Sequence, residues 1–510
     1  MKTEHHAPKG LVERYGDQII GQLRCWDRVV ITGTMVDVCH PGAMEWELRK
    51  RDIRCFDIGQ FAEPLKETVR ANAEAIAQKA GVEIEFIASK SFRQEKRIAE
   101  ILEQRGKAEG LVHVFSVMET CPAFKPWHNK TTHHTGVKLT RGKCLHYYFY
   151  EIHPRLGLCY VRVPTWLPFR LQVYFNGHNW LANPLRQAGL GFSMQDNAFT
   201  QMTDWGQAQS LADEFEIQEL QQDLEALARR YCPVVKEFAH GYHWSLMQVE
   251  YAWDIAFGNR EALAPIYQEI SRQAILTVRA ANVAHFLGKR IPMGTNTPVE
   301  SHFHTRVEGT CIRHVLGPAS IKMYDKHGQV LRIECTANNV SFFKHYRKVE
   351  HRDGTADYAV TALKKSIYSL GDLRGLMRAA IGRYLEFIGA LEDRSPGQAD
   401  LDKITRSIRD QNDRSYRGFN FFAADDLRVL QTILRGEYTI SGMSNRFLRR
   451  ILPCHTPHQI GRILKRLRLH GLIKKIGRTY KYYVTSFGQK TLLIGLKLRE
   501  HLILPSLAYA

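Results

Sequence analysis

Paired cysteines are absent from this sequence of 510 residues. Its ten cysteines are scattered along the chain, and none forms a Cys-x-x-Cys pair. This scatter argues against a zinc ribbon or finger, whose ligands come in close pairs, and against a disulfide scaffold. We therefore expect a reduced, cytoplasmic environment.

Long apolar runs and phosphate-binding glycine motifs are missing as well. No stretch approaches the roughly 20 apolar residues that a membrane-spanning helix needs, and the polar start of the chain does not resemble a signal peptide. Gly33 follows an early apolar segment, but no Gly-x-Gly-x-x-Gly or Gly-Lys-Ser/Thr motif accompanies it. The sequence therefore predicts neither a membrane protein nor a nucleotide-phosphate site.

Positive charge is present in excess. Lysine and arginine number 71 against 52 aspartate and glutamate residues, which gives a formal net charge of +19. The hydrophobic content of 44% is that of a globular chain. Such an excess favours a polyanionic partner, with nucleic acid as the first expectation and an anionic membrane surface as the second.

The patterning along the chain predicts several domains of mixed α/β and α+β class. Alternating apolar strands and amphipathic helices predict a small α/β domain over 18–120. Hairpin patterns interrupted by helical ones predict an α+β central domain over 140–390, with a mixed sheet. The polar, turn-rich stretch 391–420 predicts a linker with a short helix, and 421–510 predicts a separate basic domain.

The basic domain has the pattern of a winged helix-turn-helix. No aspartate or glutamate occurs between 441 and 499, where lysine and arginine are frequent. Three helical segments are followed by a basic hairpin around Gly477, and Thr456-Pro457 is a typical helix start. A helix of this kind can enter a major groove, although a basic helix can also be merely a solvated face. The residues expected to contact nucleic acid are Gln459, Arg462, Lys465, Arg466, Arg478 and Lys481.

Four carboxylates in the central region are candidates for a metal site. The segment 320–339 reads as a β-hairpin, with Asp325 at the end of one strand and Glu334 in its partner. Glu250 and Asp254 are four residues apart and share a face on either a strand or a helix. We expect these oxygen ligands to hold Mg²⁺ or Mn²⁺, which can activate a phosphodiester.

The order of these segments resembles that of rolling-circle replication initiators of plasmids and small phages. An apolar segment with Glu250 and Asp254 precedes Tyr324-Asp325-Lys326, and Leu331-Arg332-Ile333-Glu334 follows. The resemblance implies a nuclease core that uses a divalent metal and a tyrosine nucleophile to nick one DNA strand. The sequence departs from that family at Gln248, where an arginine usually stands, and in having no evident Tyr-x-x-Lys helix.

The nucleophile and two further ligands are assigned from short patterns. Tyr346, in a basic segment expected to be helical, is the candidate nucleophile, with Tyr368 and Tyr384 as rivals. His302 and His304 flank one phenylalanine and would point to one side of a strand as metal ligands. In the alternative interpretation, Lys326 and Arg332 neutralise the hairpin acids and the histidines are surface residues.

Two further alternatives stay open. Between 144 and 180, tyrosine, phenylalanine and tryptophan alternate with arginine and histidine, either to stack unpaired bases or to form the inner face of a sheet. The whole chain is predicted to be a metal-dependent DNA-nicking or strand-transfer protein of a mobile element, plasmid or phage. The alternative is a non-catalytic winged-helix regulator or an RNA-binding ribonucleoprotein component, with DNA expected ahead of RNA and no membrane partner.

Overall fold

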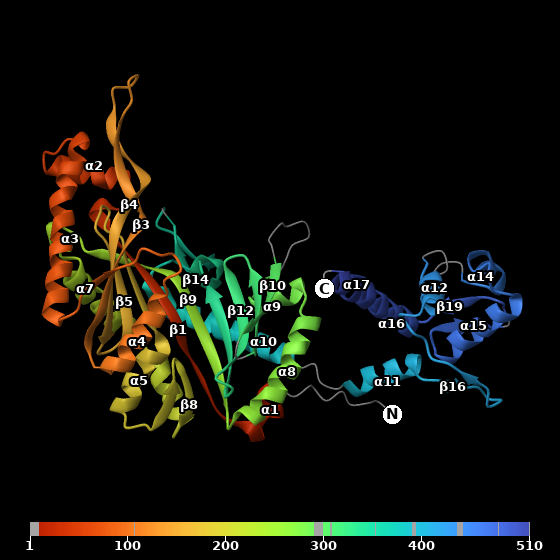
Figure 1. Cartoon of the computed structure of the whole chain (residues 1–510). Coiled ribbons are helices and arrows are strands. Elements are labelled where there is room, and N and C mark those ends of the chain that lie inside the picture. The colour runs from red at the N-terminus through yellow and green to blue at the C-terminus, as the bar shows by residue number, and fades with distance from the viewer. Residues whose placement is uncertain are drawn as a thin grey trace. The chain divides into compact units, whose positions relative to one another are not determined.

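The computed structural model describes residues 10–106, 108–289, 299–306, 309–351, 353–389, 394–435, 442–477 and 479–508. The chain divides into two compact units, residues 1–390 (unit 1) and 391–510 (unit 2) (Figure 1). Both contain helices and strands, so the prediction of a mixed α and β protein is confirmed. Among the described residues, no helix has the length and apolar character needed to cross a membrane.

Unit 1 is built on an eleven-stranded sheet that is antiparallel except for its last pair. One sheet therefore includes strands from both 18–120 and 140–390. In spatial order the strands are β10 (Val299–Arg306), β11 (Gly309–Leu316), β12 (Ala319–Lys326), β13 (Val330–Ala337), β9 (Tyr242–Phe257), β1 (Ile19–Met35), β6 (Leu171–Asn176), β5 (Gly157–Pro164), β4 (Thr135–His153), β3 (Gly110–His128) and β2 (Ile84–Phe86).

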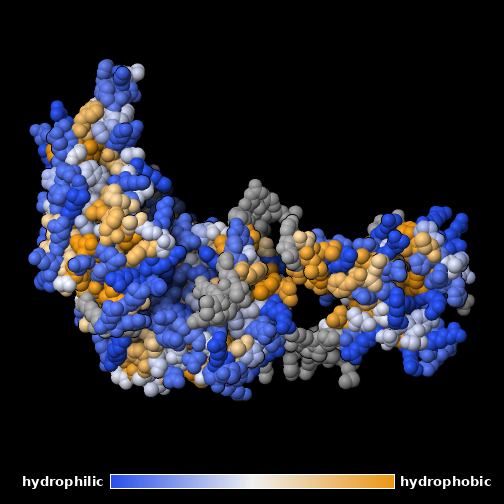
Figure 2. Space-filling model, viewed as in Figure 1, coloured by the Kyte–Doolittle hydropathy of each residue, from blue (hydrophilic) through white to orange (hydrophobic). Residues whose placement is uncertain are grey.

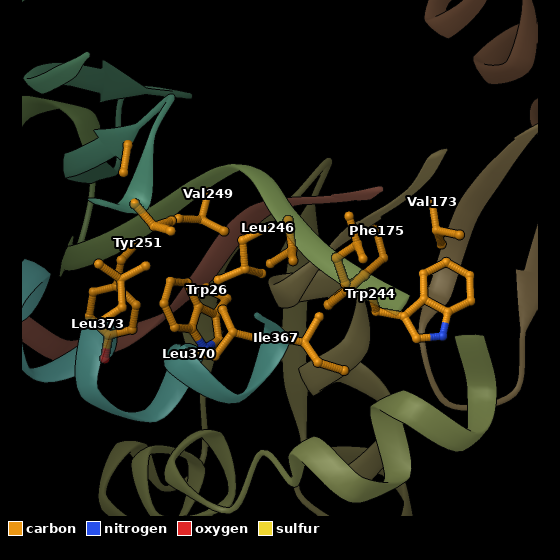
Figure 3. Packing of buried hydrophobic residues seen from close by; sticks show 14 of the residues in the cluster. Trp26, Val173, Phe175, Trp244, Leu246, Val249, Tyr251, Ile367, Leu370 and Leu373 are labelled. Atoms are coloured by element: carbon orange, nitrogen blue, oxygen red, sulfur yellow. The ribbon is translucent and has the colours of Figure 1, made fainter. Parts of the chain in front are cut away.

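Helices cover the first face of this sheet and enclose the main core. Alternate strand residues such as Val249 and Tyr251 of β9 pack there in one cluster with Leu370 and Leu373 (Figure 3). This period of two is the one expected for a strand with one buried face. The covering helices are α3 (Ile58–Ala80), α7 (Ile217–Tyr231), α8 (Arg260–Thr277), α9 (Ala280–Phe286) and α10 (Leu370–Gly389).

The second face of the sheet is covered only in part. Leu23 and Cys25 of β1 pack against Leu181, and Phe115 of β3 packs against Ile98, in two small apolar clusters. Between these clusters the strands carry polar and charged side chains. The elements on this face are α4 (Gln94–Arg105), α5 (Gly177–Gln187), α6 (Trp205–Asp213) and the hairpin of β7 (Phe192–Gln195) and β8 (Ala198–Met202).

Smaller elements complete unit 1, and one of them differs from expectation. The segment around Tyr346 is strand β14 (Lys344–Glu350), which pairs with β15 (Ala356–Ala362), and it is not helical. Its residues alternate between exposed and half-buried along the strand, a period of two that favours a strand. The remaining helices are α1 (Leu11–Arg14) and α2 (Pro41–Lys50).

Unit 2 has a core of its own, formed mainly by three helices. Ile460, Leu464 and Leu467 of the third helix are buried, and Thr456 caps its start, as its position before Pro457 predicted. The segment 391–420 packs into this core through Ile404 and Phe419. The elements are α11 (Arg394–Thr405), β16 (Ile408–Arg409), β17 (Ser415–Tyr416), α12 (Ala424–Ile433), α14 (Asn445–Ile451), α15 (Pro457–Leu469), β18 (Ile473–Lys475), β19 (Tyr482–Val484), α16 (Ser486–Lys497) and α17 (Leu504–Ala508).

Candidate metal centre

A β-bulge in β1 brings an unpredicted carboxylate to the second face of the sheet. Trp26 lies opposite Tyr251 of β9, and Val29 lies opposite Val249. Two residues of β1, Asp27 and Arg28, therefore share the space beside one residue of β9, Glu250. An extra residue of this kind bends a strand and redirects its side chains.

Three carboxylates from three strands meet at this bulge. Asp27, Glu250 and Glu334 are all buried, and each offers an oxygen within 4.8 Å of the others. Glu334 and Glu250 reach the same face because β13 and β9 pair in register, with Thr336 opposite Glu250. Buried carboxylate oxygens suit hard divalent cations such as Mg²⁺ or Mn²⁺, so this group could hold a metal ion. We call these three residues the carboxylate trio.

The fully buried Arg332 fixes one side of the trio. Its guanidinium donates two hydrogen bonds of 2.6 Å to Asp254 and one of 3.2 Å to Asp27. Burial alone would raise the pKa of Asp254, but the charge of Arg332 and the neighbouring His178 lower it to about 2. His178 of α5 lies 3.1 Å from both Asp27 and Asp254. Asp254 is thus committed to Arg332 and lies outside the trio.

Lys322 of β12 neutralises the other side. Its ammonium donates to Glu250 at 2.7 Å and to Glu334 at 3.2 Å. Tyr324, on the same face of β12, donates its hydroxyl hydrogen bond to Glu334 at 2.5 Å. Burial and the charge of Asp27 nevertheless raise the pKa of Glu334 to about 7. A carboxyl group with such a pKa can exchange a proton near neutral pH.

Asp325 does not join the trio. The hairpin pairs Asp325 with Leu331, three residues from Glu334, so the two acids point to opposite faces of the sheet. The Asp325 carboxylate instead accepts a hydrogen bond of 2.9 Å from the backbone of Gly328, within the turn. The residue directly opposite Glu334 is Lys322.

The predicted histidine ligands and the predicted nucleophile lie elsewhere. Two strands, β11 and β12, separate β10 from β13. On β10, His302 is exposed and lies 2.9 Å from Glu300. The backbone of His304 pairs with Cys311 of β11, and its side chain lies outside the described part of the structure. Tyr346 is exposed on β14, outside the large sheet.

The two rival tyrosines are also away from the trio. Tyr384 is fully buried in the core on the first face. Tyr368 is exposed, and its hydroxyl donates to Gln221. The structure therefore assembles Glu250 and Glu334 as expected but adds Asp27, Lys322 and Tyr324, which sequence reasoning had not selected.

A cleft of about 960 Å³ opens on the second face, and it is lined by Arg28, the neighbour of Asp27, but by none of the trio. Arg28, Tyr160 and Tyr174 line one side, with the two rings stacked 5.0 Å apart and the Arg28 guanidinium 5.3 Å from Tyr174. Glu95 and Glu103 line the other side, so the cleft is not uniformly attractive to phosphate. The predicted aromatic run divides between the two faces of the sheet, because Phe149, Phe175 and others are buried in the main core.

Some of the predicted nucleic-acid contacts of unit 2 are exposed, and others are bonded to acidic residues of the same unit. Arg462 and Lys481 are exposed, whereas Lys465 donates to Asp410 at 2.5 Å. Arg466, expected on the outer face of α15, instead forms two hydrogen bonds with Asp426 and lies 3.8 Å from the ring of Phe419.

Gln459 and Arg478 are the two other predicted nucleic-acid contacts of unit 2. Gln459 completes the capping box of α15 through its hydrogen bond with Thr456. Arg478 lies outside the described residues.

Comparisons with known proteins add little. No family model matches the chain, and no curated protein matches it. One solved structure that matches is a rolling circle replication initiator protein from Geobacillus stearothermophilus, with 10% identity and a TM-score of 0.18. The match covers 62% of this chain and 74% of the other. A likeness this low carries no argument about function.

Removing the Arg332 guanidinium should destabilise unit 1 strongly. Arg332→Met leaves Asp27 and Asp254 buried without their main counter-charge, which costs about 3–5 kcal/mol in comparable buried pairs. Chemical denaturation at neutral pH measures the free energy of unfolding. Arg28→Met is the control, because Arg28 is partly exposed and lies 3.7 Å from Glu250. Equal losses in the two variants would contradict the role given to Arg332.

Glu334 should make stability depend on pH. Its pKa is about 7 in the folded protein against an ordinary value of 4.5, so the folded state holds this proton more tightly than the unfolded state. Stability should therefore fall as pH rises from 4.5 to 7, by up to about 3 kcal/mol. Glu334→Gln removes that cost. The free energy of unfolding of the variant, relative to that of the wild type, should therefore increase between pH 5 and pH 8.

The control for this titration is Ser320→Ala, a neutral change on the same face of β12. Its effect on the free energy of unfolding should be constant across the pH range. A Glu334→Gln difference that is equally constant would show that Glu334 does not titrate in this window.

Proposed function

We propose that this chain is a DNA-binding protein that cleaves or transfers one DNA strand at a divalent-metal centre formed by Asp27, Glu250 and Glu334. The observation that supports this most is the convergence of three buried carboxylates in a chain with a formal charge of +19. Burying three acids together is costly unless cations balance them. A bound Mg²⁺ or Mn²⁺ would supply that balance and would polarise a phosphodiester.

The residues around the trio can position a substrate. Arg28 is half-exposed at the mouth of the cleft, where its guanidinium can hold a phosphate next to Glu250. Glu334 accepts the hydrogen bond of Tyr324, which places a phenolic hydroxyl group directly beside the trio. Lys322 keeps Glu250 and Glu334 together in the absence of an ion.

Unit 2 is proposed to select the DNA site as a winged helix-turn-helix. Supporting this are the order of α12, α14 and α15 followed by the β18–β19 hairpin, and the absence of acids from 441 to 499. The cations available for DNA differ from those first expected, because Lys465 and Arg466 are engaged within the unit. The exposed cations described between 446 and 481 are Arg446, Arg449, Arg450, Arg462, Arg468, Lys474, Lys475 and Lys481.

Loss of one carboxylate should remove the metal and the cleavage together. Glu250→Gln and Glu334→Gln keep the side-chain shape but remove a charged ligand, so Mn²⁺ affinity should fall at least tenfold. Nicking of single-stranded and supercoiled DNA should fall with it, while DNA binding in EDTA is retained. Calorimetry measures the Mn²⁺ affinity, and gel assays measure DNA nicking and DNA binding.

The matched control is Glu119→Gln. Glu119 is a part-buried acid on β3 that pairs with Arg162 and lies outside the trio. If both trio variants bound Mn²⁺ and nicked DNA as well as this control did, the metal centre would be rejected.

The tyrosine nucleophile can be assigned by comparing two conservative variants. Tyr346 is the candidate from the sequence, and Tyr324 is the tyrosine hydrogen-bonded to the trio. If cleavage proceeds through a covalent tyrosine–DNA adduct, phenylalanine at the responsible position abolishes the adduct and the other variant retains it. Denaturing gels with labelled DNA detect the adduct. If both variants formed as much covalent adduct as the wild type, neither tyrosine would be the nucleophile.

The second candidate function is a non-catalytic DNA- or RNA-binding protein. The observation in its favour is Lys322, whose contacts with Glu250 and Glu334 already satisfy part of the trio's charge. In that case Mn²⁺ would bind no more tightly to the wild type than to the trio variants.

A further inference from the structure

The β3–β4 hairpin extends beyond the large sheet as a two-stranded ribbon. β4 pairs with β5 only from His146 to His153, whereas its pairing with β3 continues out to Thr135 opposite His128. The part that pairs with no further strand, residues 120–143, is called the arm here. At about 3.4 Å per residue its strands are roughly 30 Å long. Phe124 and Val137 of the arm pack against the main core, and the end of the arm extends beyond the rest of unit 1 at the top of Figure 1.

The charge of the arm is entirely of one sign. No aspartate or glutamate occurs between 120 and 150. The arm contains five exposed basic residues, none of which forms an ion pair with a described residue, and Figure 2 shows the end of the arm as hydrophilic. The five are Lys125, Lys130, Lys138, Arg141 and Lys143.

These cations lie on both faces of the ribbon. Lys125 is directly opposite Lys138, so both side chains are on one face. Arg141 is opposite Pro122, and Lys143 is opposite Thr120, which places these two cations on the other face. Like charges directly opposite each other destabilise a strand pair, so an anionic partner would relieve a cost that the free arm bears.

The arm is anchored to α2 by a hydrogen bond. Glu45 of α2 accepts it, at 2.7 Å, from the backbone of Val137. A Cβ at Gly136 would lie 2.4 Å from the same carboxylate, so a larger residue there would displace the Glu45 side chain. A braced ribbon loses less conformational freedom on binding than a loose loop does.

We propose that the arm is a second DNA-binding element, which inserts into the major groove of a B-form duplex. The groove is about 12 Å wide and admits a two-stranded ribbon. Phosphates line both of its walls, which matches cations on both faces of the arm. The deep, narrow major groove of A-form RNA would exclude the same ribbon. This proposal does not depend on the metal centre, because the arm carries none of the trio.

The test uses the full chain with Lys125, Lys138 and Arg141 all changed to alanine. Anisotropy with a fluorescent 20-base-pair DNA duplex should show at least a tenfold loss of affinity. The slope of log affinity against log salt should fall by roughly 2 to 3, since each lost phosphate contact contributes about 0.9. Metal affinity should be unchanged, which separates this result from a failure of the trio.

The matched control replaces Lys79, Lys90 and Lys96, three exposed lysines outside the arm, with alanine. It removes the same number of positive charges, so it should weaken duplex binding by less than threefold. Melting temperatures show whether both variants are folded, and the arm variant should be no less stable than the wild type.

Three outcomes would overturn the proposal. The first is an equal effect of the arm and control variants on duplex affinity. The second is an equal loss of affinity for the duplex and for the single strand of the same sequence, which would indicate non-specific attraction. The third is unchanged duplex binding with lost binding to vesicles of phosphatidylcholine and phosphatidylserine, which would assign the arm to a membrane surface.

Discussion

The buried guanidinium of Arg332 is the interaction on which the candidate site depends. It joins β13 to Asp254 on β9 and to Asp27 on β1, and it also donates to the backbone carbonyl of Asn197 in the β7–β8 hairpin. A planar group with five donors can bridge several acceptors at once, which a lysine in the same place could not do. Without it Asp27 would keep the amide hydrogen bonds of Asn176 and Asn197 and its contact with His178, but it would lose the guanidinium that links the bulge in β1 to Asp254 on β9.

Much of the local structure could be predicted because it depends on neighbouring residues. Gly81 ends α3 in the left-handed conformation, Thr456 caps α15, and the hairpin after Ser320 turns at His327 and Gly328, both with positive φ. Glu250 and Glu334 lie together as the sequence suggested, because both belong to segments whose strand pattern is readable. Each of these features is determined within a few residues of sequence.

The rest of the site depends on strand register and on distant partners. The bulge that redirects Asp27 involves a strand more than 200 residues away, and nothing local in the sequence marks it. The exclusion of Asp325, by contrast, could have been found by counting. A turn at His327 and Gly328 pairs Asp325 with Leu331, and Glu334 then falls on the opposite face. His178 comes from a helix whose position only the complete fold determines.

The division of the chain into two cores has a consequence for how such a protein can diversify. The trio draws on strands that span residues 19 to 337, so an insertion or exchange within that stretch would disturb several strand registers at once. Unit 2 keeps its core within residues 404–492. Recombination near residue 390 could therefore exchange the C-terminal unit while the strand registers that form the trio are inherited intact.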